Sequence, residues 1–128
     1  MIIHGKEYKF LYTVRASIEI AQNLDGHSMS SISKVFNTGD QIKSMELISR
    51  MAVAMNRAYL KAKAFEDGTK FEEADVLTRE IIDNLTFDLE QELENELMLA
   101  MSSGNKTEIE TTPEKGAKGS KKNPPKSN

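Results

Sequence analysis

Cysteine is absent from this chain, and histidine occurs only twice in its 128 residues. Without cysteine the protein has neither a disulfide framework nor a thiolate zinc site, which is compatible with a reducing cytoplasm. No run approaches the ~20 apolar residues of a membrane-spanning helix, and the first residues, Met1 to Lys6, lack the basic and apolar segments of a signal peptide. We therefore expect a soluble, intracellular protein with no membrane partner.

The motifs of common catalytic and cofactor sites are also lacking. His4 and His27 have no carboxylate or second histidine at the spacing of metal ligands on a helix; we interpret His4 as a turn residue, and His27 follows Gly26, which can stop a helix. No serine lies in a Gly-x-Ser-x-Gly turn, and the glycines are too scattered for a phosphate-binding loop. The sequence therefore predicts a protein that is not an enzyme and that binds no metal or cofactor.

What the sequence does contain is divided near Ser102. Residues 1–101 carry nearly all of the large apolar side chains, whereas residues 102–128 hold one, Ile109, among Lys, Glu, Ser, Thr, Gly and Pro. A segment with so little apolar surface cannot offset the backbone entropy lost on folding, about 1–2 kcal/mol per residue. We expect one folded domain over residues 1–101 and a disordered polar tail or linker over residues 102–128.

Charge is divided at the same position. The whole chain has 17 Lys and Arg and 20 Asp and Glu; the tail holds six lysines and three glutamates, so its charge is +3 and that of residues 1–101 is −6. An acidic domain argues against nucleic-acid binding, because phosphates require a basic surface. We predict no nucleic-acid partner and interpret the tail lysines as a contribution to solubility.

The first twelve residues predict a β-hairpin. The pair His4-Gly5 can supply the positive φ angles of a tight turn. After the turn, alternation places three aromatic side chains on one face of a strand: Tyr8, Phe10 and Tyr12. Because a two-stranded hairpin is marginally stable alone, we expect this face to pack on helices.

Two short helices are expected next. Thr13 is a candidate N-cap for the first, and Asp25-Gly26 is its stop signal. The inward face of this helix is predicted to hold Val14, Ile18, Ala21 and Leu24. The second helix is indicated by Met29, Ile32, Val35 and Phe36, and it is closed by Asn37-Thr38-Gly39.

Asp40 opens the longest helical pattern, which runs from Ile42 to Phe65 and is ended by Asp67-Gly68. Its apolar positions form two rows, one with Met45, Ile48, Ala52, Met55, Tyr59 and Ala62, the other with Leu47, Met51, Ala54 and Ala58. So wide a stripe predicts a central helix that is contacted on two sides.

The capping-box spacing of Thr69-Lys70-Phe71-Glu72 predicts a further helix. Its inward positions are expected to be Phe71, Ala74, Leu77 (or Val76) and Ile81. Asp83-Asn84 interrupts the chain, and Thr86 can cap a last helix. The predicted fold is mainly α (α+β), a small N-terminal β-hairpin packed on a bundle of about four or five helices.

The last helix is acidic and amphipathic. Leucines or methionine recur every four residues, at Leu85, Leu89, Leu93, Leu97 and Met101, beside Asp88, Glu90, Glu92, Glu94 and Glu96. A metal site is disfavoured, because only carboxylates four residues apart share a face and no Glu-x-x-His element is present. We predict that this helix binds a helical partner through Leu93, Leu97, Met98 and Met101, with Glu92, Glu94 and Glu96 orienting a basic counterpart. Leu93 and Leu97 fit the protein core equally well, because leucines with a period of four are chiefly a packing signal.

The order of these elements forms a pattern of its own. Ile3-His4-Gly5-Lys6-Glu7-Tyr8-Lys9-Phe10 is followed by a helix entered at Thr13-Val14-Arg15-Ala16, a long central helix, Thr69-Lys70-Phe71-Glu72-Glu73-Ala74-Asp75, an acidic helix and a polar tail. Over residues 1 to about 101 the chain thereby resembles the tail assembly chaperones of long-tailed (siphovirus-like) bacteriophages and prophages. No residue of that family is specific enough to be carried over as a binding site.

The resemblance implies a small, mainly helical protein of the infected bacterial cytoplasm that is absent from the mature virion. It implies binding to the tape measure protein and recruitment of tail tube protein. It also implies a longer form made by a programmed ribosomal frameshift, for which Lys121-Lys122-Asn123 could be encoded by an adenine-rich slippery run. The alternative is a small phage or bacterial regulator, an inhibitor or antitoxin-like protein, that occludes a protein target through the acidic helix. A second copy of the chain, in a homo-oligomer, is a further candidate partner.

Overall fold

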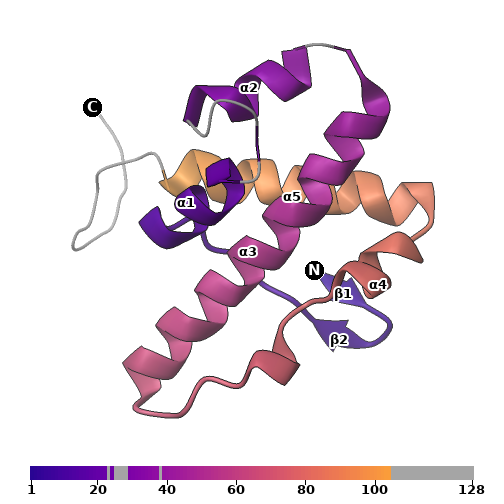
Figure 1. Ribbon diagram of the computed structural model, residues 1–128. Helices are drawn as coiled ribbons and strands as arrows, with labels where there is room; N and C mark the ends of the chain where they lie inside the picture. Colours follow the sequence, from indigo (N-terminus) through magenta and orange to yellow (C-terminus); the bar gives the residue numbers. More distant parts are fainter. Residues whose placement is uncertain (23, 25–28, 38, 105–128) are drawn as a thin grey trace, which may run out of the picture.

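The N-terminal residues form a hairpin, and most of the described chain after it is helical (Figure 1). The computed structural model describes residues 1–22, 24, 29–37 and 39–104. Their elements are, in chain order, β1 (Ile2–Ile3), β2 (Lys6–Glu7), α1 (Val14–Gln22), α2 (Met29–Asn37), α3 (Gln41–Asp67), the 3₁₀ helix η1 (Glu73–Asp75), α4 (Arg79–Asp83) and α5 (Phe87–Gly104). The predicted mainly α fold with a small N-terminal hairpin is confirmed.

Helix α3 runs diagonally through the middle of the molecule, and the four other α-helices pack on it (Figure 1). The carboxylate of its N-cap, Asp40, accepts a hydrogen bond from the Lys43 N–H at 3.1 Å. The helix ends at Gly68, whose φ of 69° is a left-handed conformation that glycine adopts without strain. Both predicted ends are therefore correct. The wide apolar surface is also confirmed, since both rows contribute buried side chains: Leu47, Ile48, Met51, Ala52, Ala54, Met55 and Ala58.

The hairpin turn forms as predicted, but the strand after it does not continue. His4 and Gly5 take φ angles of 51° and 81°. The two strands have two residues each, and beyond them the chain crosses α3, where the Leu11 N–H donates to the Met55 carbonyl at 3.1 Å. Tyr8 is buried, and the side chains of Phe10 and Tyr12 are half-buried against the same core. The three aromatic side chains therefore pack on the core as predicted, although the residues that carry them do not form a strand.

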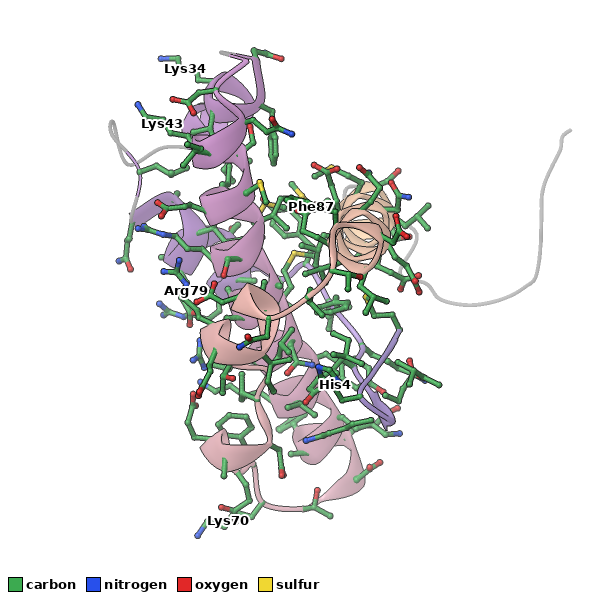
Figure 2. The ribbon with its side chains drawn as sticks, turned by 90° about the vertical axis from the view of Figure 1, so that its right-hand side faces the viewer. His4, Lys34, Lys43, Lys70, Arg79 and Phe87 are labelled. Carbon is green, nitrogen blue, oxygen red and sulfur yellow. The ribbon has the colours of Figure 1, made fainter. Side chains whose placement is uncertain are left out.

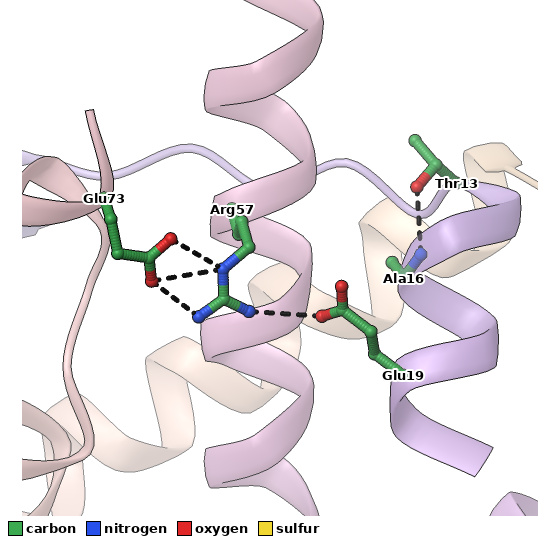
Figure 3. Close-up of polar contacts among 5 residues, drawn as sticks. All are labelled: Thr13, Ala16, Glu19, Arg57 and Glu73. Atoms are coloured by element: carbon green, nitrogen blue, oxygen red, sulfur yellow. Dashed lines mark hydrogen bonds and ion pairs between the residues drawn. The ribbon is translucent and has the colours of Figure 1, made fainter. Parts of the chain in front are cut away.

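Helix α1 begins as predicted but turns a different face inward. Thr13 Oγ1 accepts a hydrogen bond from the Ala16 N–H at 3.1 Å (Figure 3). Val14 and Ile18 are exposed, and the buried residues are Ala16, Ser17, Ile20 and Ala21. Small side chains let two helices approach closely, a contact that a search for large apolar residues overlooks. The predicted face is therefore wrong for Val14 and Ile18 and right for Ala21 and for Leu24, which is half-buried against the core.

Helix α2 agrees with its predicted range. Ile32 is buried, and Val35 and Phe36 are half-buried against the core. Gly39, after the helix, has a φ of 78°. Thr38 and the predicted stop at Asp25-Gly26 lie outside the described residues.

The helix predicted from Thr69 is wrong. Residues 69–72 are not helical, and Glu72 caps only η1, without a side-chain hydrogen bond. Ala74 is exposed instead of inward, whereas Val76 and Leu77 are both buried. The Leu77 N–H donates to Asn56 Oδ1 in α3 at 2.8 Å, a contact between distant parts of the sequence that a local capping signal does not contain.

Two further local signals are confirmed at the following helices. Helix α4 starts after Thr78 and ends at Asp83, where the interruption was predicted. Thr86 Oγ1 accepts a hydrogen bond from the Leu89 N–H at 3.3 Å at the start of α5. Because α5 continues to Gly104, Ser102 and Ser103 are helical, and the folded domain extends beyond the predicted boundary. The remainder of the predicted tail lies outside the described residues.

Candidate functional site

Two of the predicted partner-binding residues belong to the core. Leu93 and Leu97 are both 0 % exposed and pack in the same cluster as the buried residues of α3. The apolar face of α5 is used to attach this helix to α3. The interpretation of Leu93 and Leu97 as an open binding surface is therefore wrong, and the core alternative is correct.

The other predicted residues do not form one surface. Glu94 Oε1 accepts a hydrogen bond from Gln91 Nε2 at 2.9 Å, and Glu96 Oε1 lies 3.9 Å from the Met1 amine. Glu92 and Met98 are exposed, and Met101 is half-buried against the core. On a helix, Glu94 and Met98 share one face and Glu92 and Glu96 another. The structure thus does not bring these side chains together as a single partner site.

A groove does lie at the other end of α5, where α3, α4 and α5 meet. Its volume is about 380 Å³. Its apolar side chains are Ile42, Met45, Ile82, Leu85 and Phe87, and its polar ones are Glu46, Ser49, Arg79, Asp83 and Glu90. Figure 2 shows Phe87 at the start of α5, on the side that faces α3, and Arg79 lower down, on the other side of α3 in this view. We call this hollow the α3–α5 groove.

Large apolar side chains at the α3–α5 groove are open to solvent. Phe87 is 79 % exposed and Ile42 is 74 % exposed. Single exposed apolar residues are normal on a protein surface, whereas an exposed pair that meets at a hollow is typical of a binding surface. Phe65, near the C-terminal end of α3, is 90 % exposed but lines neither the α3–α5 groove nor a second hollow beside the hairpin.

Local capping fixes the walls of the groove. The Thr86 cap makes Phe87 the first residue of α5, and the Thr78 cap starts the short α4. Arg79 Nε donates a hydrogen bond to Ser49 Oγ on α3 at 3.2 Å, which attaches α4 to the central helix. Ile82 is buried beneath the groove. These contacts fix the positions of the helices that form the walls of the groove.

The groove carries a net negative charge. Its ionisable side chains are the carboxylates of Glu46, Asp83 and Glu90 and the guanidinium of Arg79. Within the described part of the chain, none of the three carboxylates accepts a hydrogen bond or forms an ion pair. Burial, and secondly the nearby charge of Glu94, raise the pKa of Glu90 above its ordinary value of 4.5. A partner with positive charge would relieve this unfavourable placement.

A second hollow, of about 290 Å³, lies beside the hairpin. It is lined by Lys6, Glu7, Tyr8, Lys9, Asn56, Tyr59, Leu60 and Asp75. The Lys6 ammonium donates to the Asp75 carbonyl at 3.4 Å and lies 5.2 Å from the centre of the Tyr8 ring. None of its lining residues is a large apolar side chain that is widely exposed, so it is a weaker candidate than the α3–α5 groove.

The clearest ionic cluster among the described residues is structural. Arg57 on α3 donates two hydrogen bonds to Glu73 Oε2, the shorter at 2.8 Å, and one to Glu19 Oε1 at 3.1 Å (Figure 3). Glu73 belongs to η1 and Glu19 to α1, so Arg57 links both elements to the central helix. The hydrogen bonds from Arg57 lower the pKa of Glu73.

Other kinds of site have no counterpart in the described ranges. No group of three or more His, Asp or Glu side chains is placed to hold a metal ion there. His4 is exposed at the hairpin turn, and His27 lies outside the described residues. Within the same ranges, no helix is long and apolar enough to cross a membrane.

Sequence reasoning missed the α3–α5 groove. In the sequence, Ile42 is only the first residue of the long helical pattern, and no pattern gives Phe87 a role. One signal was present at Phe87, because this residue directly follows the cap Thr86 and does not belong to the Leu85, Leu89, Leu93 series. Its meeting with Ile42 depends on how α5 crosses α3, which no local pattern specifies.

Comparison of the chain with family models, with curated proteins and with solved structures gives no match.

Proposed function

We propose that this protein is a tail assembly chaperone of a long-tailed bacteriophage or prophage, which binds the tape measure protein by non-covalent contacts. The observation that carries the proposal is the α3–α5 groove, where exposed Ile42 and Phe87 flank a hollow whose carboxylates have no partner among the described residues. A chaperone for a long helical polypeptide needs an open apolar surface with a charged rim and no reactive group.

The order of elements supports the same proposal. The hairpin, the short α1, the long central α3 and the acidic α5 follow the order on which the resemblance to these chaperones depends. One part differs, since residues 69–72 do not start a helix. The resemblance is thus to the architecture, and the partner site is inferred from the groove.

In this proposal the chaperone covers apolar side chains of the tape measure protein and helps to recruit tail tube subunits. Burial of apolar surface supplies affinity, at about 25 cal/mol per Å² before the costs of association. Such a role places the protein in the cytoplasm of the infected bacterium and not in the mature virion. Many copies on one long partner would give stable coverage from individually weak contacts.

Co-expression tests the proposal. The tape measure protein of the same phage or prophage is produced with and without this chain, and its soluble fraction is measured. We expect the tape measure protein to aggregate alone, and to remain soluble and co-purify with the chaperone. A tape measure protein that is equally soluble without this chain would overturn the proposal.

Gene order supplies a second test. A tail tube gene upstream and a very long tape measure gene downstream would support the chaperone. A toxin gene next to this one would instead favour the regulator, an antitoxin-like protein.

A further inference from the structure

The walls of the α3–α5 groove determine which backbone conformation can bind there. The described residues that line it come from three helices and from the short connection that holds Leu85, and no described strand lies among them. An extended peptide would find no free strand edge in this groove, so its own backbone groups would lose water without gaining partners. An α-helix satisfies its own backbone and presents side chains at positions i, i+3, i+4 and i+7. The groove therefore favours a helical occupant.

The charges of the groove determine which kind of helix can bind there. Carboxylates occur on all three walls, with Glu46 on α3, Asp83 on α4 and Glu90 on α5. Among the described residues of the groove the one cation is Arg79, whose Nε already donates a hydrogen bond to Ser49 Oγ. A lysine or arginine of a docked helix can reach these carboxylates, which have no partner within the described ranges, while its apolar neighbours cover Ile42 and Phe87.

We propose that the α3–α5 groove binds a basic amphipathic α-helix, whose apolar side chains contact Ile42 and Phe87 and whose lysines or arginines pair with Glu46, Asp83 and Glu90. Identifying this helix as a segment of the tape measure protein rests on the proposed function; the chemistry of the occupant does not.

The lysine-rich end of the same chain is a poorer occupant. Residues 105–128 contain six lysines but only one large apolar side chain, Ile109. They could satisfy the carboxylates but could not cover two exposed apolar residues. A separate helix supplies both kinds of side chain.

A synthetic peptide tests the inference on the full chain. The probe is a fluorescein-labelled peptide of two Leu-Lys-Lys-Leu-Leu-Lys-Leu heptads, and the counterpart replaces each lysine by glutamate. Fluorescence anisotropy is expected to show saturable binding of the lysine peptide, weakened by added salt, and none of the glutamate peptide. Equal binding of both peptides, or of neither, would overturn the proposal.

Matched variants locate the binding site. Phe87→Ser and Ile42→Ser should each weaken binding of the lysine peptide by about tenfold or more, as for central interface residues. Phe65→Ser removes a phenylalanine that is even more exposed than Phe87 but lies far from the groove, and it should change the affinity for the lysine peptide less than about twofold. Because all three side chains are exposed, circular dichroism and thermal melting should show folded variants. An equal loss in Phe65→Ser would contradict binding in the groove.

The charges are tested in the same way. Glu90→Gln should weaken binding of the lysine peptide and reduce its salt dependence, whereas Glu92→Gln, elsewhere on α5, should not. Equal effects of the two variants would show attraction to the acidic surface in general and would overturn the proposed pairing.

Other occupants give distinct results. If deletion of residues 105–128 is required before the lysine peptide binds, the end of the chain occupies the groove and the proposal is wrong. If the protein dimerises in sedimentation and Phe87→Ser makes it monomeric, the occupant is a second copy, and the proposal is again wrong.

Experiments with the tape measure protein distinguish a failure of the proposed function from a failure of the groove inference. If the lysine peptide binds the groove but the tape measure protein is not solubilised, the proposed function fails and the groove inference stands. If the tape measure protein is solubilised equally by Phe87→Ser and by the parent protein, the tape measure protein is not the occupant of the groove, and the proposed function stands.

Discussion

Asn56 Oδ1 accepts a hydrogen bond from the backbone N–H of Leu77 at a distance of 2.8 Å. The Nδ2 group of the same side chain donates to the Lys9 carbonyl at 2.9 Å. Asn56 lies in the middle of α3 and is 1 % exposed. One buried amide thus pairs backbone groups of both irregular segments that cross the central helix, the one before α1 and the one before α4. Neither segment has a strand partner there, so this side chain supplies the pairing that buried backbone groups need.

Substituting Asn56 should therefore destabilise the whole domain. Asn56→Ala leaves the Lys9 carbonyl and the Leu77 N–H without their partner, and we expect a loss of about 2–4 kcal/mol in the free energy of unfolding. Urea denaturation followed by circular dichroism measures this loss. Asn84→Ala is the control, because Asn84 Nδ2 donates to the Glu80 carbonyl at an exposed position, and its loss should be below about 1 kcal/mol. Similar losses in both variants would show that Asn56 has no special structural role.

Two leucines of α5 test the assignment of its faces. Leu97 is completely buried, whereas Leu99 is 66 % exposed. Leu97→Ala should lower the free energy of unfolding by about 2–5 kcal/mol, the range for truncating a buried leucine. Leu99→Ala should change it by less than about 0.5 kcal/mol. Thermal melts of the two variants measure the difference, and a small effect of Leu97→Ala would restore the open-surface interpretation of this residue.

The ion pair of Arg57 and Glu73 predicts a pH dependence. Hydrogen bonds from Arg57 hold the pKa of Glu73 below its ordinary value of 4.5. The folded protein therefore binds this proton less tightly than the unfolded chain, so the contribution of Glu73 to stability is complete above about pH 4.5 and is lost at lower pH. Glu73→Gln should lower the free energy of unfolding by less than about 1 kcal/mol at pH 7, because the carboxylate is largely exposed.

The deficit of Glu73→Gln relative to the parent protein should shrink as the pH falls below 4.5, which urea denaturation at pH 7 and at a pH well below 4.5 measures. Glu72→Gln removes the same charge at the neighbouring position, where the described residues include no ion pair with that side chain. It should match the parent protein at both pH values. A deficit of Glu73→Gln that persists at low pH would mean that shape, and not charge, accounts for the loss.

Signals that act over a few residues predicted much of this fold. Thr13, Asp40 and Thr86 each cap the helix that was assigned to them, and Gly68 ends α3. A cap joins a side chain to an N–H group three residues away, so the sequence nearby contains the whole interaction. The same reasoning failed at Thr69, because residues 69–72 are not helical, and further along the Leu77 N–H pairs with Asn56 of α3.

The candidate site could not be predicted in this way. The period-four leucines of α5 indicate an apolar face, but they do not say whether the protein itself or a partner covers it. In the structure α3 covers Leu93 and Leu97, and the open surface is formed by Ile42 and Phe87, which come from different helices. Their meeting depends on the angle at which α5 crosses α3, and that angle depends on the whole core.

The last prediction concerns the cost of Glu90 to the free protein. Burial, and secondly Glu94, raise the pKa of Glu90 above its ordinary value of 4.5. The folded protein then binds this proton more tightly than the unfolded chain, so the stability of the fold falls as the pH rises through the raised pKa. The charged groups that share the groove are Glu46 on α3, and Arg79 and Asp83 on α4; Arg79 forms no ion pair with Glu90 within the described residues.

Glu90→Gln should therefore be more stable than the parent protein at pH 7, and the gain should vanish at a pH well below 4.5, where the glutamate is protonated in both states. Urea denaturation at the two pH values measures the gain, and Glu92→Gln, at an exposed position of the same helix, should show none. The same Glu90→Gln variant is expected to bind the lysine peptide more weakly, so that stability and binding change in opposite directions. A residue that costs stability and supports binding is characteristic of a functional surface. If Glu90→Gln is instead less stable than the parent protein at pH 7, the Glu90 carboxylate stabilises the fold, and the proposed trade of stability for binding at this residue is wrong.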